Sequence, residues 1–396
     1  MATTVLAGGA QVASALDTPP CSGAVAAPPA AMQDGRSASQ VVRVPESIPS
    51  DGSVDVAPQL QQWIQSVPSG PDADHPTVIE FRPGGCYRVD DTLTLGLRSS
   101  SGPAGLHWPE LPFFKLDNVR LDLRGSVLFQ GDATPWSPRT VSEPAQQPRR
   151  KYGNPIVFLP GVSGVSIVNG TLRSTNTAAA YQPKVREAWA CIWVAGARPG
   201  EPAPSRVEIS GMHLTNCWGD GVYVTGMTTR GLEVKGLEIL GNTISGTGRH
   251  GVTVQGASDV LVQGNEIRRI PRFVFDAEPS AAMGIAGLRW SENTGSSGHL
   301  GYAQYGGAAR AAGAHLTFDG NTIDEGVWRF RFGGGSTSRR GLVIRGNRNV
   351  GVDRFERKPN LLGRHIVLVG GNWAEVEVTD NRQSVLEGTA ATCAVN

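Results

Sequence analysis

A short motif that recurs five times in the second half of the chain constrains the fold more than any other feature. Each copy is a strand-like apolar run, then Gly-Asn or Asp-Asn, then another strand-like run. The copies contain Asn242, Asn265, Asn321, Asn347 and Asn381. Asn242 and Asn265 are 23 residues apart, and Asn321 and Asn347 are 26 apart. One coil of a parallel β-solenoid uses a similar length, so the repeat predicts stacked coils with one long outer face that suits a polymer.

Composition agrees with an all-β chain and excludes some functions. The 51 glycines and 27 prolines among 396 residues are spread along the sequence and separate short strand-like runs such as 119–123 and 165–168. The net charge of +1 gives no support for nucleic-acid binding. The sequence contains no run of 18 apolar residues, so no membrane span is predicted.

The first 50 residues are predicted to lie outside the solenoid, which we expect over residues 51–396. Residues 3–16 are small and apolar and end in a sequence that resembles a signal-peptidase site, but a charged n-region is missing. They are either the remnant of a signal peptide, which implies secretion, or an Ala-rich disordered leader. Residues 17–50 are rich in Pro, Ala and Ser and predict a flexible lead-in.

The five cysteines do not show whether the protein works in an oxidising or a reducing cellular compartment. An odd number leaves at least one unpaired in a monomer, and connectivity does not follow from sequence. Cys191 and Cys217 fall on nearby coils and are either a buried pair or core thiols.

A short amphipathic helix is predicted where the solenoid starts. Asp55 is suited to cap it, and its apolar face is formed by Val56, Leu60, Ile64 and Val67, with Trp63 beside them. A strand, a Pro-Gly turn and a second strand follow over residues 77–89. Because an open solenoid end exposes core and strand edges, we expect this helix to cover it.

The helix and strand pair resemble the entry of right-handed parallel β-helix proteins of the pectate-lyase and polygalacturonase-like superfamily. Three later motifs are similar to those of a group of secreted actinobacterial β-helix proteins; they occupy residues 219–224 (GDGVYV), 248–252 (GRHGV) and 275–279 (FDAEP). The resemblance covers residues 52–385. It implies an all-β, single-stranded right-handed parallel β-helix with a short N-terminal capping helix, and action on polysaccharide. This chain lacks the Glu-x-x-His element that the group often carries one coil earlier, since residues 187–190 read EAWA.

The apolar pattern stacks these motifs. Val222 and Val224, Val252 and Val254, and Phe275 and Ala277 are expected to face the core. Alternation then places Tyr223, Thr253 and Asp276 in one outward column, and Thr225, Gln255 and Glu278 in the next. We therefore predict one polar patch on consecutive coils. Its catalytic candidates are Asp220, Tyr223, His250, Asp276 and Glu278, and its substrate-binding candidates are Trp218, Arg249, Gln255, Arg272, Arg329 and Arg331.

This patch has the groups needed to cleave an acidic polysaccharide. Hydrolysis with inversion uses two carboxyl groups roughly 6.5–9.5 Å apart, and strand geometry predicts about 6–7 Å between Asp276 and Glu278. Arginines bind uronate carboxylates in a bidentate manner. A glycoside hydrolase of polygalacturonase-like type is the first hypothesis, with no required cofactor and no metal ligand assigned.

Other interpretations stay open. A lyase or uronate epimerase would use Arg249, His250 or Tyr223 as the base, and Asp276 and Glu278 would then hold Ca²⁺. The chain is alternatively a non-catalytic carbohydrate-binding or phage-tail-like module, or a structural β-helix whose arginines pair with its acids. A monomer and a trimer fit equally.

Two segments interrupt the repeat. Residues 132–155 and 279–314 are predicted to be loop excursions beside the groove. Trp136, Arg149, Arg150 and Lys151 lie in the first, and Trp290, His299, Tyr302 and Tyr305 in the second, where aromatic rings would stack on sugars. The alternative for 279–314 is an irregular coil with a surface loop.

Overall fold

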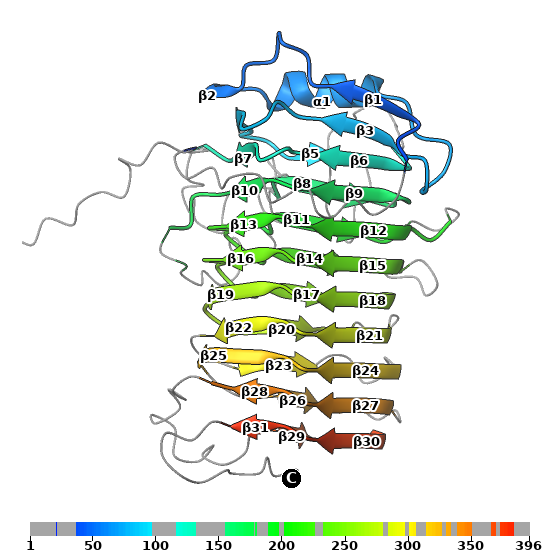
Figure 1. Cartoon of the computed structure of the whole chain (residues 1–396), viewed down its shortest axis with the longest axis vertical. Coiled ribbons are helices and arrows are strands. Elements are labelled where there is room, and N and C mark those ends of the chain that lie inside the picture. Colours follow the sequence, from blue (N-terminus) through cyan, green and yellow to red (C-terminus); the bar gives the residue numbers. More distant parts are fainter. Residues whose placement is uncertain are drawn as a thin grey trace, which may run out of the picture.

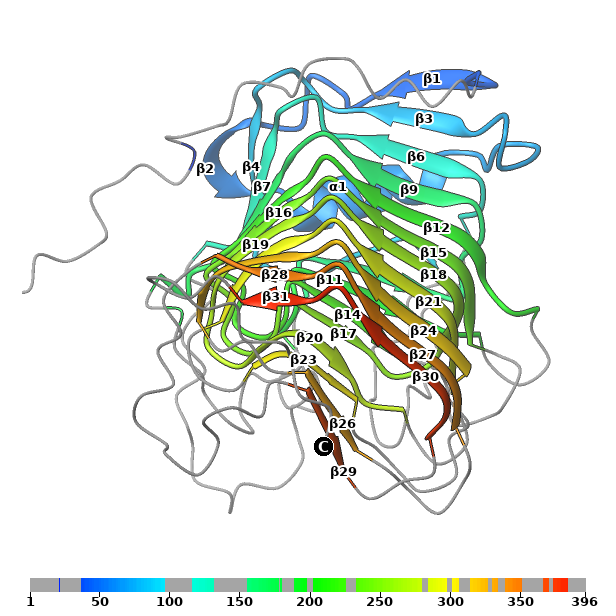
Figure 2. The ribbon, with the colours of Figure 1, turned by 60° about the horizontal axis from the view of Figure 1, so that its bottom comes forward.

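The chain winds into stacked coils that build three parallel sheets (Figure 1). The computed structural model describes residues 21, 37–96, 116–131, 155–177, 179, 189–197, 202–225, 233–279, 284–297, 301–305, 314–326, 330–333, 339–350, 366–369 and 373–383. Every strand pair in these residues is parallel, and neighbouring strands come from successive coils. Figure 2 shows the coils nested on one another. The predicted parallel β-helix is confirmed.

Each complete coil gives one strand to each sheet. In the described residues the first sheet contains β1 (Gln40–Arg43), β3 (Thr77–Glu80), β6 (Val119–Asp122), β9 (Val165–Val168), β12 (Ser205–Ser210), β15 (Val234–Leu240), β18 (Ala257–Gln263), β21 (Ile285–Ser291), β24 (Ala314–Asp319), β27 (Arg339–Arg345) and β30 (Trp373–Thr379). The second contains β2 (Asp51–Asp55), β4 (Cys86–Arg88), β7 (Val127–Phe129), β10 (Thr171–Arg173), β13 (His213–Thr215), β16 (Thr243–Ser245), β19 (Glu266–Ile270), β22 (Thr294–Ser297), β25 (Thr322–Gly326), β28 (Arg348–Asn349) and β31 (Arg382–Gln383). The third contains β5 (Leu93–Thr94), β8 (Val157–Pro160), β11 (Ile192–Ala195), β14 (Val222–Thr225), β17 (Val252–Val254), β20 (Phe273–Ala277), β23 (Gly301–Tyr305), β26 (Phe330–Gly333) and β29 (Ile366–Val369).

The asparagines of the repeat form a buried ladder between the first and second sheets. The Asn242 side-chain amide donates to the Ile209 carbonyl at 2.9 Å and to Asn265 Oδ1 at 2.9 Å. The same pattern continues through Asn293, Asn321, Asn347 and Asn381, so each asparagine bonds the next along the stack. The left-handed turn residue is the one before each asparagine, for example Gly241 at φ 58°, and not the asparagine itself.

Asn293 is a rung that the repeat did not reveal. Its preceding residue is Glu292, at φ 57°, instead of the Gly or Asp that marks the other copies. Within the described part of residues 279–314, β21, β22 and β23 form a coil, with register shifts where β22 pairs with β19 and with β25. This fits the alternative of an irregular coil and not a simple loop excursion. Trp290, Tyr302 and Tyr305 are buried, so they pack in the coil and do not stack on sugars. His299 and residues 132–154 lie outside the described residues.

A short helix lies at the N-terminal end of the stack (Figure 1). Helix α1 (Ala57–Ser66) buries Leu60 and Ile64, and the Asp55 carboxylate accepts the Ala57 N–H at 3.0 Å. Gln61 on this helix donates to the Thr94 carbonyl and accepts the Thr94 N–H. The helix thereby satisfies the edge strand of the third sheet, as its predicted capping role requires.

The solenoid starts earlier than residue 51. Strand β1 pairs with β3 from inside the segment that we expected to be a lead-in, because Val41 and Val42 extend along the open edge of the first sheet. The segment expected to be a signal remnant lies outside the described residues.

Two disulfides join Cys21 to Cys86 and Cys191 to Cys217, so the second pair is bonded and is not two core thiols. Cys393 lies outside the described residues. Within the residues that the structure describes, no helix is both long and apolar enough to cross a bilayer.

Candidate active site

The three motifs meet on the outer face of the third sheet, where β14, β17 and β20 lie side by side. Tyr223 pairs with Thr253, and Thr253 pairs with Asp276, so the predicted column is confirmed in its register, although Thr253 and Asp276 are buried. The inward neighbours Val252 and Phe275 are buried in the core. Because this alignment depends only on register, residues 23 and 30 positions apart in the chain become vertical neighbours.

A buried ion pair forms the upper edge of the site. Arg249 donates through Nε to Asp220 Oδ1 at 2.8 Å and through Nη2 to Oδ2 at 2.6 Å. The His250 backbone N–H donates to the same Oδ1 at 2.9 Å. With both oxygens engaged, Asp220 is not placed to activate water, in contrast to the expectation. The pair matches the alternative that we left open, in which arginines pair with acids structurally.

Arg249 links this ion pair to the acids of the next coil. Its Nη1 lies 3.8 Å from Glu278 Oε2, and its guanidinium lies 5.3 Å from the centre of the Tyr223 ring. Burial alone would lower the pKa of Arg249, but the Asp220 carboxylate outweighs it and the pKa is raised. Arg249 therefore stays charged and does not serve as a base. We expected Arg249 to bind substrate, but its side chain is only 6% exposed and is not available for this role.

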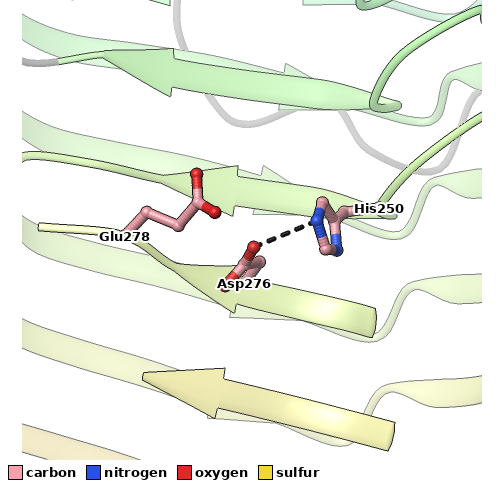
Figure 3. Close-up of side chains that lie close together, drawn as sticks. All are labelled: His250, Asp276 and Glu278. Carbon is pink, nitrogen blue, oxygen red and sulfur yellow. Dashed lines mark ion pairs between the residues drawn. The ribbon is translucent and has the colours of Figure 1, made fainter. Parts of the chain in front are cut away.

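His250, Asp276 and Glu278 form what we call the carboxyl–imidazole cluster (Figure 3). One ligand atom from each lies within 4.8 Å of the others, and His250 Nε2 is 3.0 Å from Asp276 Oδ2. Asp276 is fully buried, whereas the Glu278 side chain is 35% exposed. The two carboxyl groups thus approach more closely than the predicted 6–7 Å. Glu278 is the member that solvent and a ligand reach.

The cluster holds fewer charges than its composition suggests. Burial, and secondly the negative charge of Glu278, raise the pKa of Asp276 well above its ordinary range. Burial, followed by the charges of Arg249 and Arg272, lowers the pKa of His250 well below its ordinary range. Both shifts favour the uncharged forms, a neutral imidazole at His250 and a protonated carboxyl group at Asp276.

The residues do not fit a metal cation. Ca²⁺ takes about six to eight oxygen ligands, and the cluster offers two carboxyl groups and one imidazole beside an arginine. Coordination through Nε2 of a neutral imidazole requires the proton on Nδ1. His250 Nδ1 instead accepts the Phe273 N–H at 3.2 Å, so its lone pair faces a donor.

Of the other predicted residues, some lie beside the cluster and others do not. Gln255 follows β17 and lies in line with Glu278, and the Arg272 N–H donates to the Arg249 carbonyl beside the cluster. The Trp218 indole instead donates to Thr175 on the preceding coil. Arg329 lies outside the described residues. Arg331 lies on β26 in register with Gln304, and its side chain lies outside the described residues.

Gln304 is a site residue that sequence reasoning missed. It pairs directly with Asp276 on β23 and is half-buried. The alternation of Ala303, Gln304 and Tyr305 carries the necessary signal, but it lies in the stretch that we took for a loop.

Comparison with known proteins defines the architecture. Residues 203–385 match the family model of the right-handed β-helix region. The endo-xylogalacturonan hydrolase from Aspergillus tubingensis is similar over 87% of this chain and 92% of its own, with 11% identity and a TM-score of 0.54. PfbA, a surface adhesin of Streptococcus pneumoniae, is similar over 86% and 91%, with 8% identity and a TM-score of 0.46. The polygalacturonase from Erwinia carotovora is similar over 91% and 97%, with 10% identity and a TM-score of 0.43.

No curated protein sequence matches this chain. At such low identities the structural likeness defines the fold alone. The family match over residues 203–385 and the three parallel sheets together show that the fold is a right-handed parallel β-helix.

Proposed function

We propose that this protein is a secreted glycoside hydrolase that cleaves a uronate-containing polysaccharide with the carboxyl pair Asp276 and Glu278. The observation that carries the proposal is a buried carboxyl group of raised pKa beside a partly exposed one on the outer face of stacked coils. Groups of raised pKa in such positions are typical of proton donors. The two disulfides support an oxidising, extracellular location.

The short separation favours one acid–base unit over two opposed groups. An inverting hydrolase needs roughly 6.5–9.5 Å between its carboxyl groups, which exceeds the separation of the nearest oxygens here. In our mechanism Glu278 touches the substrate, and the proton of Asp276 passes through Glu278 to the glycosidic oxygen. The carbon–oxygen bond breaks, water attacks the sugar carbon, and the proton of that water returns to the pair. Arg249 beside Glu278 stabilises the charge of the pair while the proton is away.

The test is a screen of uronate-containing and neutral polysaccharides with reducing-end assays, ultraviolet absorbance and product mass. We expect new reducing ends from a uronate polymer and no unsaturated product. Asp276→Asn and Glu278→Gln should each lower kcat/KM at least about a hundredfold while leaving the fold intact. The matched control is Asp319→Asn on β24, whose partner is Arg345. An unsaturated product would identify a lyase instead, and near-normal rates in both site variants would refute the assignment.

A further inference from the structure

We propose that His250 is the positioning residue of the carboxyl pair: its Nε2–H donates to Asp276 Oδ2 and so holds the proton of Asp276 on Oδ1. The inference rests on the proposed function only for its effect on rate. Its structural content concerns the tautomer and the pairing of His250, which can be measured without any substrate.

The surroundings of the imidazole select one tautomer. Nδ1 accepts the Phe273 backbone N–H at 3.2 Å, and the ring stacks on the Phe273 ring at an interplanar angle of 12°. A nitrogen that accepts this donor carries no hydrogen. Because the buried imidazole is neutral, its one hydrogen must be on Nε2.

This hydrogen has one buried acceptor within reach. Nε2 lies 3.0 Å from Asp276 Oδ2, off the N–H axis. Among the described residues, neither Nε2 nor either Asp276 oxygen has a hydrogen-bond partner. Leaving these buried groups unbonded is costly, and catalytic hydrogen bonds often tighten only when the substrate binds. A small carboxyl rotation pairs Nε2–H with Oδ2, and an Oδ2 that accepts leaves the acid proton on Oδ1.

The Arg249–Asp220 ion pair gives this arrangement its rigidity. Asp220 holds the His250 backbone N–H at 2.9 Å, and Arg249 holds both Asp220 oxygens. The imidazole is thus anchored from the preceding coil through its backbone and from the next coil through Phe273. A buried ion pair that fixes a neighbouring ring explains why this pair lies beside the cluster.

Two variants test the roles of the two ring nitrogens separately. His250→Gln places an amide N–H near the position of Nε2 and keeps the donor to Asp276. His250→Asn places an amide oxygen near Nδ1, which keeps the bond from Phe273 but loses that donor. We expect the alkaline limb of the kcat/KM pH profile, which reports loss of the catalytic proton, to stay in place for the first variant and to rise by about one pH unit for the second. The described ionisable side chains that face the cluster are Asp220, Tyr223, Arg249 and Arg272, and both variants leave them unchanged.

The ¹⁵N chemical shifts of the His250 ring can be measured without any activity. Of the signals from the seven histidines, those of His250 are the ones that disappear in both variants. We expect an unprotonated Nδ1 and a protonated Nε2 from pH 5 to 8 in the wild-type protein. A proton on Nδ1, or a shift of the Nε2 signal on addition of Zn²⁺ alone, would overturn the proposal. Equal pH profiles for the two variants would also overturn it. If no polysaccharide is cleaved, the proposed function fails while the ¹⁵N result still decides the tautomer.

Discussion

The asparagine ladder and the carboxyl–imidazole cluster are two sets of buried polar side chains stacked along the same axis, and they differ in how they are satisfied. Asn265 in the ladder donates to Ile239, Gln263 and Asn293, and its own Oδ1 accepts from Asn242. In the cluster, His250 Nε2 and both Asp276 oxygens have no hydrogen-bond partner among the described residues. In the ladder the polar groups bond neighbouring coils to one another. In the cluster the polar groups stay available for a ligand.

This difference separates structural from functional polarity within one fold. Buried polar groups are bonded in most native structures, and each one that is not needs an explanation. Unsatisfied groups cost about 1–3 kcal/mol each. Their concentration beside the partly exposed Glu278 is the physical reason for placing the active site there and not at the ladder.

The largest expected effect is on the ion pair that borders the cluster. Arg249→Met should lower the free energy of unfolding by about 3–5 kcal/mol, because it leaves the buried Asp220 carboxylate without its partner. Urea denaturation measures the change. A loss below about 1 kcal/mol would mean that Asp220 is reached by water and that the pair is not structural.

A single rung of the ladder should have the next largest effect. Asn293→Ala removes two bonds accepted from Asn265 and the amide bonds to the Val262 carbonyl and to Asn321, and leaves buried backbone groups unsatisfied. We expect a loss of about 2–3 kcal/mol in the same assay. The control is Gln263→Ala, whose amide bonds only the exposed Glu292 side chain. Equal stabilities for the two variants would contradict the structural role of the ladder.

The cluster should make stability depend on pH in the direction opposite to a paired carboxylate. The pKa of Asp276 is raised, so between about pH 4, the ordinary value, and its folded value the native state binds more protons than the unfolded state. Stability contributed by this group is therefore present at low pH and is lost as pH rises through that window. Asp276→Asn should remove this slope, by about 1.4 kcal/mol for each unit of pKa shift.

Unfolding of both proteins at pH 4 and pH 7 checks this slope. The lowered pKa of His250 adds a loss of stability below about pH 6.5, and because His250 lies 3.0 Å from Asp276 the difference between the two proteins reports Asp276 together with its effect on His250. Parallel curves would show that Asp276 is ionised in the native state at neutral pH.

The smallest effect is expected at a solvent-exposed ion pair on the first sheet. Arg345 bonds Asp319 through Nη2 at 2.7 Å with its side chain 49% exposed, in the same donor–acceptor arrangement as the buried pair. Arg345→Met should leave the unfolding midpoint unchanged, because water replaces the lost partner. A clear loss would show that geometry, and not burial, makes the Arg249–Asp220 pair important.

The sequence by itself determined the fold and the alignment of the site. Strand alternation together with the Asn repeat fixes which residues face the core, and this alone aligned Tyr223, Thr253 and Asp276 across three coils. The repeat did not reveal the coil that contains β21, β22 and β23, because Glu292 stands where the other coils have Gly or Asp. Gln304 on β23 was therefore not predicted as a site residue.

Only the tertiary structure decided the roles within the patch. Side-chain directions at turns do not follow from strand alternation. The sequence therefore did not show that Arg249 is paired with Asp220, or that Glu278 remains partly exposed. Burial has the same origin, because the dielectric around Asp276 and His250 depends on everything packed above them. The chain order fixes which residues are neighbours, and the packed structure fixes which of them keep their protons.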